Sequence, residues 1–242
     1  MRIHRVHTDL TLEPGHEVTL VGRTGHYLSR VLRVAAGQTI VVFNGDGRDY
    51  VAEVIRAGRN ELVLSVTSSL PAVRESHLDI TVVQAISRGE RMDQTLQKCT
   101  ELGVNAFQPL FSERVEVRLK AEKLSRRLDH WQAVVISACE QSGRAVIPEV
   151  REPLVLRDWL LAGDAAARVV LAPGTELPLA RLALPQQLQL VVGPEGGFSD
   201  AEMDLMDARG VQAVSLGPRV LRTETAAPAA VSVVQALAGD LG

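Results

Sequence analysis

Two loops rich in glycine and proline near the end of the chain could bring reactive side chains and open backbone together. The first spans residues 193–197 and follows an apolar run, and the second spans residues 216–226 and leads into an alanine-rich stretch. Glycine has no Cβ, so such loops let the backbone approach a ligand closely. In open α/β sheets, ligands bind beyond the carboxyl ends of the strands. The two loops together predict a ligand site; the alternative is a pair of strand-to-helix turns that hold nothing.

The first loop also restricts the kind of ligand. The phosphate-binding patterns G-x-x-x-x-G-K-[ST] and G-x-G-x-x-G are absent from the sequence. Glu195 lies in the middle of the loop, where its carboxylate would repel a phosphate. A neutral or cationic ligand is therefore favoured. S-adenosylmethionine, with its sulfonium cation, is one such ligand, but the loop chemistry does not single it out.

Other catalytic patterns do not occur. The sequence holds no G-x-S-x-G, H-E-x-x-H or C-x-x-C motif. His4 and His7 are spaced like metal ligands, but no cysteine or carboxylate cluster accompanies them. We expect no metal site.

The elements that must position the two loops alternate between strand and helix after residue 77. Buried or half-buried strands are expected at 78–86, 106–110, 169–172, 188–192 and 214–216. Helices are expected at 91–102, 124–138 and 199–208, the third of which starts with a capping-box pattern at Ser199 and Glu202. A last alanine-rich helix is expected to have Pro228 in its first turn. This alternation predicts a mostly parallel sheet covered by helices.

The first part of the chain has a different pattern. Short strands with alternating polarity are expected at 16–21, 38–43, 50–55 and 61–66, with a short helix at 26–33. Residues 71–77 have the polar composition of a linker. We therefore predict two domains, a small β-barrel-like domain at 1–72 and an α/β domain at 73–242.

The composition is that of a folded globular chain. Of 242 residues, 46% are hydrophobic, 23% are charged and only 3% are aromatic, with a formal net charge of −3. These values exclude a disordered chain or a disulfide scaffold, and they exclude aromatic base stacking as the main binding device. Cys99 and Cys139 fall in helix-like stretches, so reduced, buried thiols in a cytoplasmic protein are expected. The longest uncharged apolar stretch, 226–239, is shorter than the roughly 20 residues of a membrane span, and no signal peptide is expected.

The two loops resemble the signatures of a known family. Gly-Pro-Glu-Gly-Gly at 193–197 and Leu-Gly-Pro-Arg-Val-Leu-Arg-Thr-Glu-Thr-Ala at 216–226 are similar to those of the SPOUT-class 16S ribosomal RNA uridine-N3 methyltransferases. The blocks 97–104, 111–114, 140–144 and 147–149 also match, as do the N-terminal residues 2–5 and 31–33. His4 stands where the family often has proline. The resemblance therefore extends over nearly the whole chain.

The resemblance implies a fold, a reaction and partners. It implies an N-terminal PUA-like RNA-binding domain, a trefoil-knotted C-terminal domain and a homodimer with the site near its interface. The reaction is methylation of N3 of a uridine in 16S ribosomal RNA, within the small ribosomal subunit, with S-adenosylmethionine as the methyl donor. Two alternatives are kept, a SPOUT methyltransferase for another RNA base and a non-catalytic RNA-binding module for ribosome assembly.

The resemblance also implies roles for particular residues. Glu224 is the candidate base for the N3 proton, and Arg222 is the candidate for stabilising charge on the uracil oxygens; an ion pair between them that braces the loop is the alternative. The expected donor-binding set, some of which could instead be core, is Leu171, Pro173, Gly193, Glu195, Gly196, Gly197, Leu216, Gly217, Leu221, Arg222 and Thr223. The expected RNA contacts, which could instead be solvated surface, are Arg2, Arg5, Arg30, Arg33, Arg114, Arg118, Lys120 and Arg144.

Overall fold

The computed structural model describes residues 3–72, 74–115, 121–163 and 166–242. The chain divides into two compact units, Met1–Glu75 with Cys139–Ile147 and Ser76–Ala138 with Pro148–Gly242. The first unit thus includes a segment that returns from the middle of the chain. The sequence held no signal for this segment, and the domain boundary expected after residue 72 does not include it.

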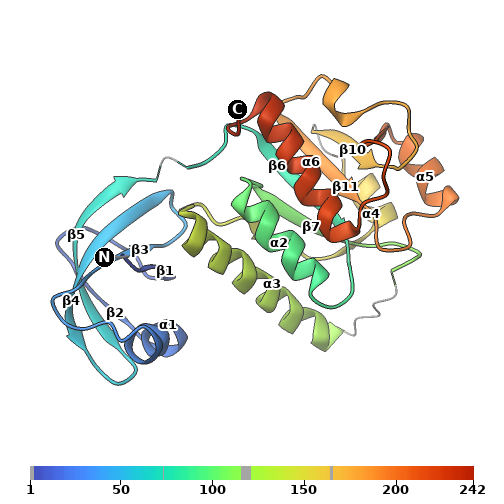
Figure 1. Ribbon diagram of the computed structural model, residues 1–242. Coiled ribbons are helices and arrows are strands. Elements are labelled where there is room, and N and C mark those ends of the chain that lie inside the picture. Colours follow the sequence, from blue (N-terminus) through green and yellow to red (C-terminus); the bar gives the residue numbers. More distant parts are fainter. Residues whose placement is uncertain (1–2, 73, 116–120, 164–165) are drawn as a thin grey trace. The chain divides into compact units, whose positions relative to one another are not determined.

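Five strands form one sheet in the described part of the first unit. The strands are β1 (Arg5–His7), β2 (Glu17–Leu20), β3 (Thr39–Phe43), β4 (Arg48–Ala57) and β5 (Leu62–Pro71). They lie in the order β1-β3-β4-β5-β2 (Figure 1). β1 is parallel to β3, and the other neighbouring pairs are antiparallel. The four predicted strands are confirmed; β1 has only three residues, too few for an alternating pattern to be recognised.

The predicted short helix of this unit is divided in two. It consists of α1 (Gly22–His26) and a π-helical segment, η1 (Tyr27–Val31). Leu28 is fully buried and belongs to the same aliphatic core as Ile40 and Leu64 of the sheet. The burial of Leu28 holds this segment against the sheet.

The sheet of the second unit is parallel in all its described strand pairs. Its strands are β6 (Asp79–Ala85), β7 (Ala106–Phe111), β8 (Glu149–Val150), β9 (Leu154–Val155), β10 (Ala167–Leu171), β11 (Gln187–Val192) and β12 (Gln212–Val214). The order is β12-β10-β11-β6-β7-β8, with β9 also paired to β7. The expectation of a parallel α/β sheet is confirmed. β8 and β9 were not predicted, because two residues give no pattern.

Helices cover the sheet of the second unit. The helices are α2 (Arg91–Glu101), α3 (Ala121–Ser142), α4 (Leu156–Leu161), the short 3-10 turn η2 (Leu179–Arg181), α5 (Asp200–Asp207) and α6 (Thr223–Ala238). α2 and α6 lie side by side (Figure 1). Val83 of β6 packs in one core cluster with Trp159 of α4 and Met206 of α5. Neighbouring residues of a strand point to opposite faces, so Gln84 points away from α4 and α5.

Two local predictions meet different outcomes at α5 and α6. Ser199 caps α5 in a full capping box with Glu202, as the sequence indicated. The placement of Pro228 in the first turn of the last helix is wrong, since α6 already begins at Thr223 and Pro228 lies in its interior. The helix begins early because the carbonyl of Arg222 accepts hydrogen bonds from the amides of Thr225 and Ala226.

The cysteines are buried, and two of the histidines lie at the surface. Cys99 and Cys139 are free thiols and buried. His26 and His130 lie on exposed helix surfaces, as expected. Within the described residues, no helix is long and apolar enough to cross a membrane.

Candidate functional site

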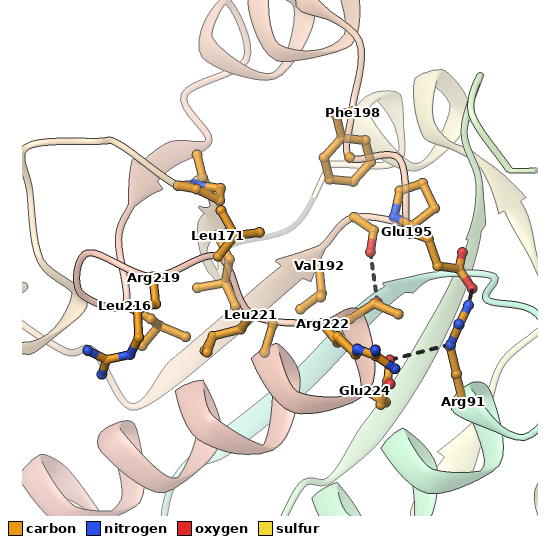
Figure 2. A pocket seen from close by; sticks show the side chains of 18 of the residues that line it. Arg91, Leu171, Val192, Glu195, Phe198, Leu216, Arg219, Leu221, Arg222 and Glu224 are labelled. Carbon is orange, nitrogen blue, oxygen red and sulfur yellow. Dashed lines mark hydrogen bonds and ion pairs between the residues drawn. The ribbon is translucent and has the colours of Figure 1, made fainter.

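A cavity of about 620 Å³ lies beyond the carboxyl ends of β10, β11 and β12 (Figure 2). The loops that follow these strands surround it, and the start of α6 forms part of its wall. We call it the loop cavity. Its volume is within the range of roughly 300–1,000 Å³ that is usual for small-ligand sites. The two glycine-rich loops are therefore parts of one site and not independent turns.

Nearly all of the residues expected to bind a ligand line this cavity. Those that do are Leu171, Pro173, Gly193, Glu195, Gly197, Leu216, Gly217, Leu221, Arg222 and Thr223. Gly196 is not among the lining residues. Its carbonyl instead accepts a hydrogen bond of 2.8 Å from Nη1 of Arg114, and a Cβ placed on it would lie 3.5 Å from that arginine side chain.

Two of the lining glycines have a backbone conformation that other residues rarely adopt. Gly197 has φ +67° and Gly217 has φ +82°. A Cβ at either position would meet no atom within 4 Å, so each glycine is required by its conformation and not by crowding. Gly193 differs, because a Cβ there would lie 3.3 Å from the ring of Phe198.

One side of the loop cavity is apolar. Leu171, Leu216 and Leu221 contribute to it, and Figure 2 shows these side chains grouped together, away from Glu195 and Arg91 but with Arg219 beside them. Val220, also a lining residue, is 80% exposed. An aliphatic wall of this kind suits the flat face of a heterocyclic base.

The other side of the cavity is charged, and it contains an arginine that the sequence analysis missed. Nη1 of Arg91, the first residue of α2, lies 2.6 Å from Oε1 of Glu195, and its Nε lies 3.8 Å from Oε2 of Glu224. Figure 2 shows Arg91 between the two carboxylates. The guanidinium joins two loops that are far apart in the sequence.

These contacts determine the ionisation of Glu195. Burial by itself would raise its pKa. Its own amide, the Arg88 amide at 3.0 Å and the Arg91 guanidinium outweigh that effect and lower the pKa below the ordinary value. Glu195 is thus held as a carboxylate, with one cation already beside it.

Glu224 is in a different situation. Its side chain is only 15% exposed, and Oε2 is buried without a hydrogen-bond partner in the structure. Buried carboxylate oxygens normally accept hydrogen bonds. One that accepts none next to a cavity, with only the Arg91 guanidinium at 3.8 Å, marks a group that is available to a ligand. The expected alternative, an ion pair with Arg222, is not seen: the Arg222 side chain is exposed and pairs with no residue that the structure describes.

Thr223 connects the two loops. Its hydroxyl donates a hydrogen bond of 2.9 Å to the carbonyl of Gly193. The side chain is 5% exposed, although the residue lines the cavity. The first residue of α6 is therefore fixed to the first residue of the glycine loop.

The residues expected to contact RNA are placed very differently from one another. Arg30 and Arg33 lie on the surface of the first unit, and Arg33 has an unusual positive φ of 53°. Arg114 is exposed in the second unit. Arg2, Arg118 and Lys120 lie outside the described residues.

Arg5 and Arg144 instead stabilise the first unit. Nη2 of Arg5 lies 2.7 Å from Asp49 Oδ1, and its guanidinium stacks 3.8 Å from the centre of the Phe43 ring. Arg144 is 3% exposed at its side chain and lies 2.6 Å from Glu75. Both guanidiniums are turned inward, so a phosphate contact is no longer assigned to them.

Metal ligands do not gather anywhere in the part of the chain that the structure describes. No group of three or more His, Cys, Asp or Glu side chains lies close enough together to hold an ion.

Comparison with known proteins agrees with this geometry. Residues 74–235 match a family model described as an RNA methyltransferase domain, and residues 20–67 match an RNA methyltransferase PUA domain. A curated relative from Buchnera aphidicola, ribosomal RNA small subunit methyltransferase E, is 32% identical over 99% of this chain and 98% of its own. One of the same name from Synechocystis is 36% identical over 91% of this chain and 73% of its own.

Solved structures give the same result. A methyltransferase from Legionella pneumophila, solved with bound S-adenosylmethionine, has a TM-score of 0.95 and 39% identity over the full length of both chains. A ribosomal RNA small subunit methyltransferase E from Neisseria gonorrhoeae, also bound to S-adenosylmethionine, has a TM-score of 0.93 and 36% identity over the full length of both chains.

Proposed function

The chain belongs to the RNA methyltransferase family, with its PUA-like and parallel-sheet domains, and from this premise we propose that it methylates N3 of a uridine in 16S ribosomal RNA with S-adenosylmethionine as donor. The observation that carries the proposal is the loop cavity, which combines an apolar wall with a buried carboxylate oxygen that accepts no hydrogen bond. Its relatives are named for methylation of small-subunit ribosomal RNA, and two similar structures hold this donor.

The residues of the loop cavity fit the donor. Leu171, Leu216 and Leu221 would hold the adenine, and the glycine loops would let their backbone groups approach it. The carboxylates Glu195 and Glu224 give a sulfonium cation a favourable electrostatic environment. The donor, when bound, supplies a methyl group on a positively charged sulfur.

The protein must make N3 of uridine nucleophilic, because that nitrogen carries a proton. Glu224 is the residue we assign to accept this proton, since its Oε2 is buried beside the cavity and accepts no hydrogen bond. As the proton leaves N3 for the Glu224 carboxylate, negative charge builds up on the uracil oxygens. The free guanidinium of Arg222, two residues earlier, is assigned to stabilise that charge.

Recognition of the RNA is assigned to exposed cations on both units. Arg30 and Arg33 serve the first unit, and Arg114 serves the second. Arg2, Arg118 and Lys120 stay predictions of the same kind. The target is proposed to be ribosomal RNA within the small subunit, and the reaction is placed in the cytoplasm for that reason.

Two further properties come from the family resemblance. We propose a homodimer with the site near its interface, and a trefoil-knotted path through the loops that surround the cavity. Both belong to the proposal and are supported by family membership alone.

Deletion of the gene, followed by mass mapping of the ribosomal RNA, tests the proposal. We expect one uridine of 16S RNA to lose a methyl group at N3, and the wild-type gene to restore it. The Glu224→Gln variant should not restore it, although it should still bind the donor. A methyl group missing from another base, or from no RNA at all, would contradict the proposed reaction.

A further inference from the structure

A glutamine lies fully buried at the carboxyl end of the central strand β6. Gln84 has no exposed surface and is paired in the sheet with Val192 of β11 on one side and Pro109 of β7 on the other. It does not line the loop cavity. Buried polar side chains are normally kept for the hydrogen bonds that they make, so the partners of Gln84 indicate its role.

Its amide nitrogen serves two acceptors. Nε2 donates to the carbonyl of Ala85 and to Oγ1 of Thr223, each at 2.9 Å. The carbonyl of Ala85 can only accept, so the nitrogen of the amide must be the atom that faces both groups. Oγ1 of Thr223 therefore receives a hydrogen bond from Gln84.

The direction of the hydrogen bond from Gln84 determines where the Thr223 hydroxyl can donate its proton. A hydroxyl has a single proton to donate. Because Gln84 occupies a lone pair of Oγ1, that proton is free to go to the carbonyl of Gly193, which lies 2.9 Å away. The relay runs from Gln84 to Thr223 to Gly193, and each step has a defined donor.

We propose that Gln84 is a positioning residue, whose amide fixes the Thr223 hydroxyl and so keeps the start of α6 bonded to the glycine loop. This inference rests on the proposed function. Thr223 precedes Glu224, the assigned base, and Gly193 opens the loop that contains Glu195. Loss of the relay would let the two carboxylates shift relative to one another while the fold remains.

The oxygen of the amide supports a role beyond packing. Oε1 of Gln84 is buried and has no hydrogen-bond partner. An apolar side chain of similar shape would avoid leaving this oxygen unpaired. Core packing alone therefore does not explain a glutamine at position 84, whereas the hydrogen bonds that its amide nitrogen donates do.

The neighbouring strand offers a matched control. Gln108 of β7 is also buried, at 5% exposure, and its Nε2 also donates to two carbonyls, those of Pro109 and Glu152. It does not line the loop cavity, and none of its partners does. Gln84→Leu and Gln108→Leu therefore remove the same groups from similar surroundings, but only the first breaks the relay.

The experiment measures melting temperature, S-adenosylmethionine affinity by calorimetry, and kcat and KM for methylation. Both leucine variants should melt at lower temperatures than wild type. Gln84→Leu alone should weaken donor binding by about tenfold, the effect of one hydrogen bond, and should also lower kcat at saturating donor. Equal donor affinity and kcat in the two variants would overturn the proposal.

Substitutions at Thr223 provide a second, independent test. Thr223→Ser keeps the hydroxyl and should retain more donor affinity and a higher kcat than Thr223→Val, which should lose as much as Gln84→Leu. Combining Gln84→Leu with Thr223→Val should add little further loss, because both break one relay. Fully additive losses would show that the two residues act separately, against the proposal. If the wild type binds donor but methylates no ribosomal RNA, the proposed function fails, while donor affinities of the same variants still decide the role of Gln84.

Discussion

Arg91 and Glu195 form a 2.6 Å ion pair between the first residue of α2 and the middle of the glycine loop. The same guanidinium lies 3.8 Å from Glu224 at the start of α6. One arginine thus partly neutralises two carboxylates at the charged side of the loop cavity. Two more arginines, Arg219 and Arg222, also line the cavity.

Replacing Arg91 should change the pH dependence of donor binding. In Arg91→Ala, Glu195 loses the guanidinium that helps to lower its pKa, so its pKa should rise relative to wild type. The loss of donor affinity on acidification should accordingly occur at higher pH than in wild type. Calorimetric titrations from about pH 3 to pH 7, a range that extends below the ordinary glutamate pKa of about 4.3, measure this shift.

A second ion pair on α2 serves as the control for Arg91. Lys98 lies 2.9 Å from Glu101 and does not line the cavity, so Lys98→Ala should leave the pH profile unchanged. The lowered pKa of Glu195 also stabilises the fold above the unfolded pKa, and this contribution is lost as the pH falls through the folded value. Identical binding profiles for Arg91→Ala and wild type would rule out the bridging role of Arg91.

A side chain at Gly217 should block the donor. Gly217→Val places a branched side chain in the cavity wall at φ +82°, and Gly210→Val creates the same kind of strain at φ +74°, away from the cavity. Each variant should lose about 1–2 kcal/mol of unfolding free energy from the left-handed backbone. Only Gly217→Val should abolish donor binding in calorimetry. Donor affinity retained in Gly217→Val would remove this loop from the site.

Loss of Arg30 and Arg33 should weaken RNA binding and its salt dependence. Each phosphate contact removed should reduce the slope of log affinity against log salt by about 0.7–0.9. Arg56→Ala is the control, since Arg56 is exposed on the same unit but is paired with Glu61 at 3.2 Å. Filter binding of a 16S RNA fragment between about 50 and 200 mM salt gives the slopes. A double variant with an unchanged slope would show that these arginines do not contact phosphate.

The two cysteines should resist alkylation in the folded protein. Burial, opposed by the nearby Arg144 guanidinium, raises the pKa of Cys139 to about 11, and burial also raises the pKa of Cys99. Fewer than about one Cys139 in a hundred is therefore a thiolate at pH 8. Mass spectrometry after iodoacetamide treatment should show little label without urea and two labels with it. Rapid labelling of the native protein would indicate that these thiols are accessible.

The fold could be predicted from the sequence where hydrophobic pattern and length agreed. Long apolar runs predicted β6 and β11 correctly, and the spacing of Ser199 and Glu202 predicted the cap of α5. The pattern failed for the start of α6. A proline is usually placed in a first turn, but here backbone hydrogen bonds to the Arg222 carbonyl start the helix earlier.

The site was predicted only as far as its loops. The glycines and the glutamate of each loop are close together in the sequence, so both loops could be recognised. No local pattern connects Arg91 to Glu195, which lies 104 positions later. Arg5 and Arg144 were expected to contact RNA, but the structure pairs them with residues of the first unit. An arginine in a buried ion pair and an arginine on the surface look the same in the sequence. Only the three-dimensional contacts distinguish these roles.

The central claim is that the loop cavity delivers a methyl group to N3 of uridine. The most direct measurement incubates the purified protein with S-adenosylmethionine carrying a deuterated methyl group and small subunits from cells that lack the gene, followed by mass spectrometry of the nucleosides. The account predicts deuterated N3-methyluridine with the wild-type protein and a loss of about a hundredfold or more with Glu224→Gln. Label on another atom or base, or no label on RNA at all, would contradict it.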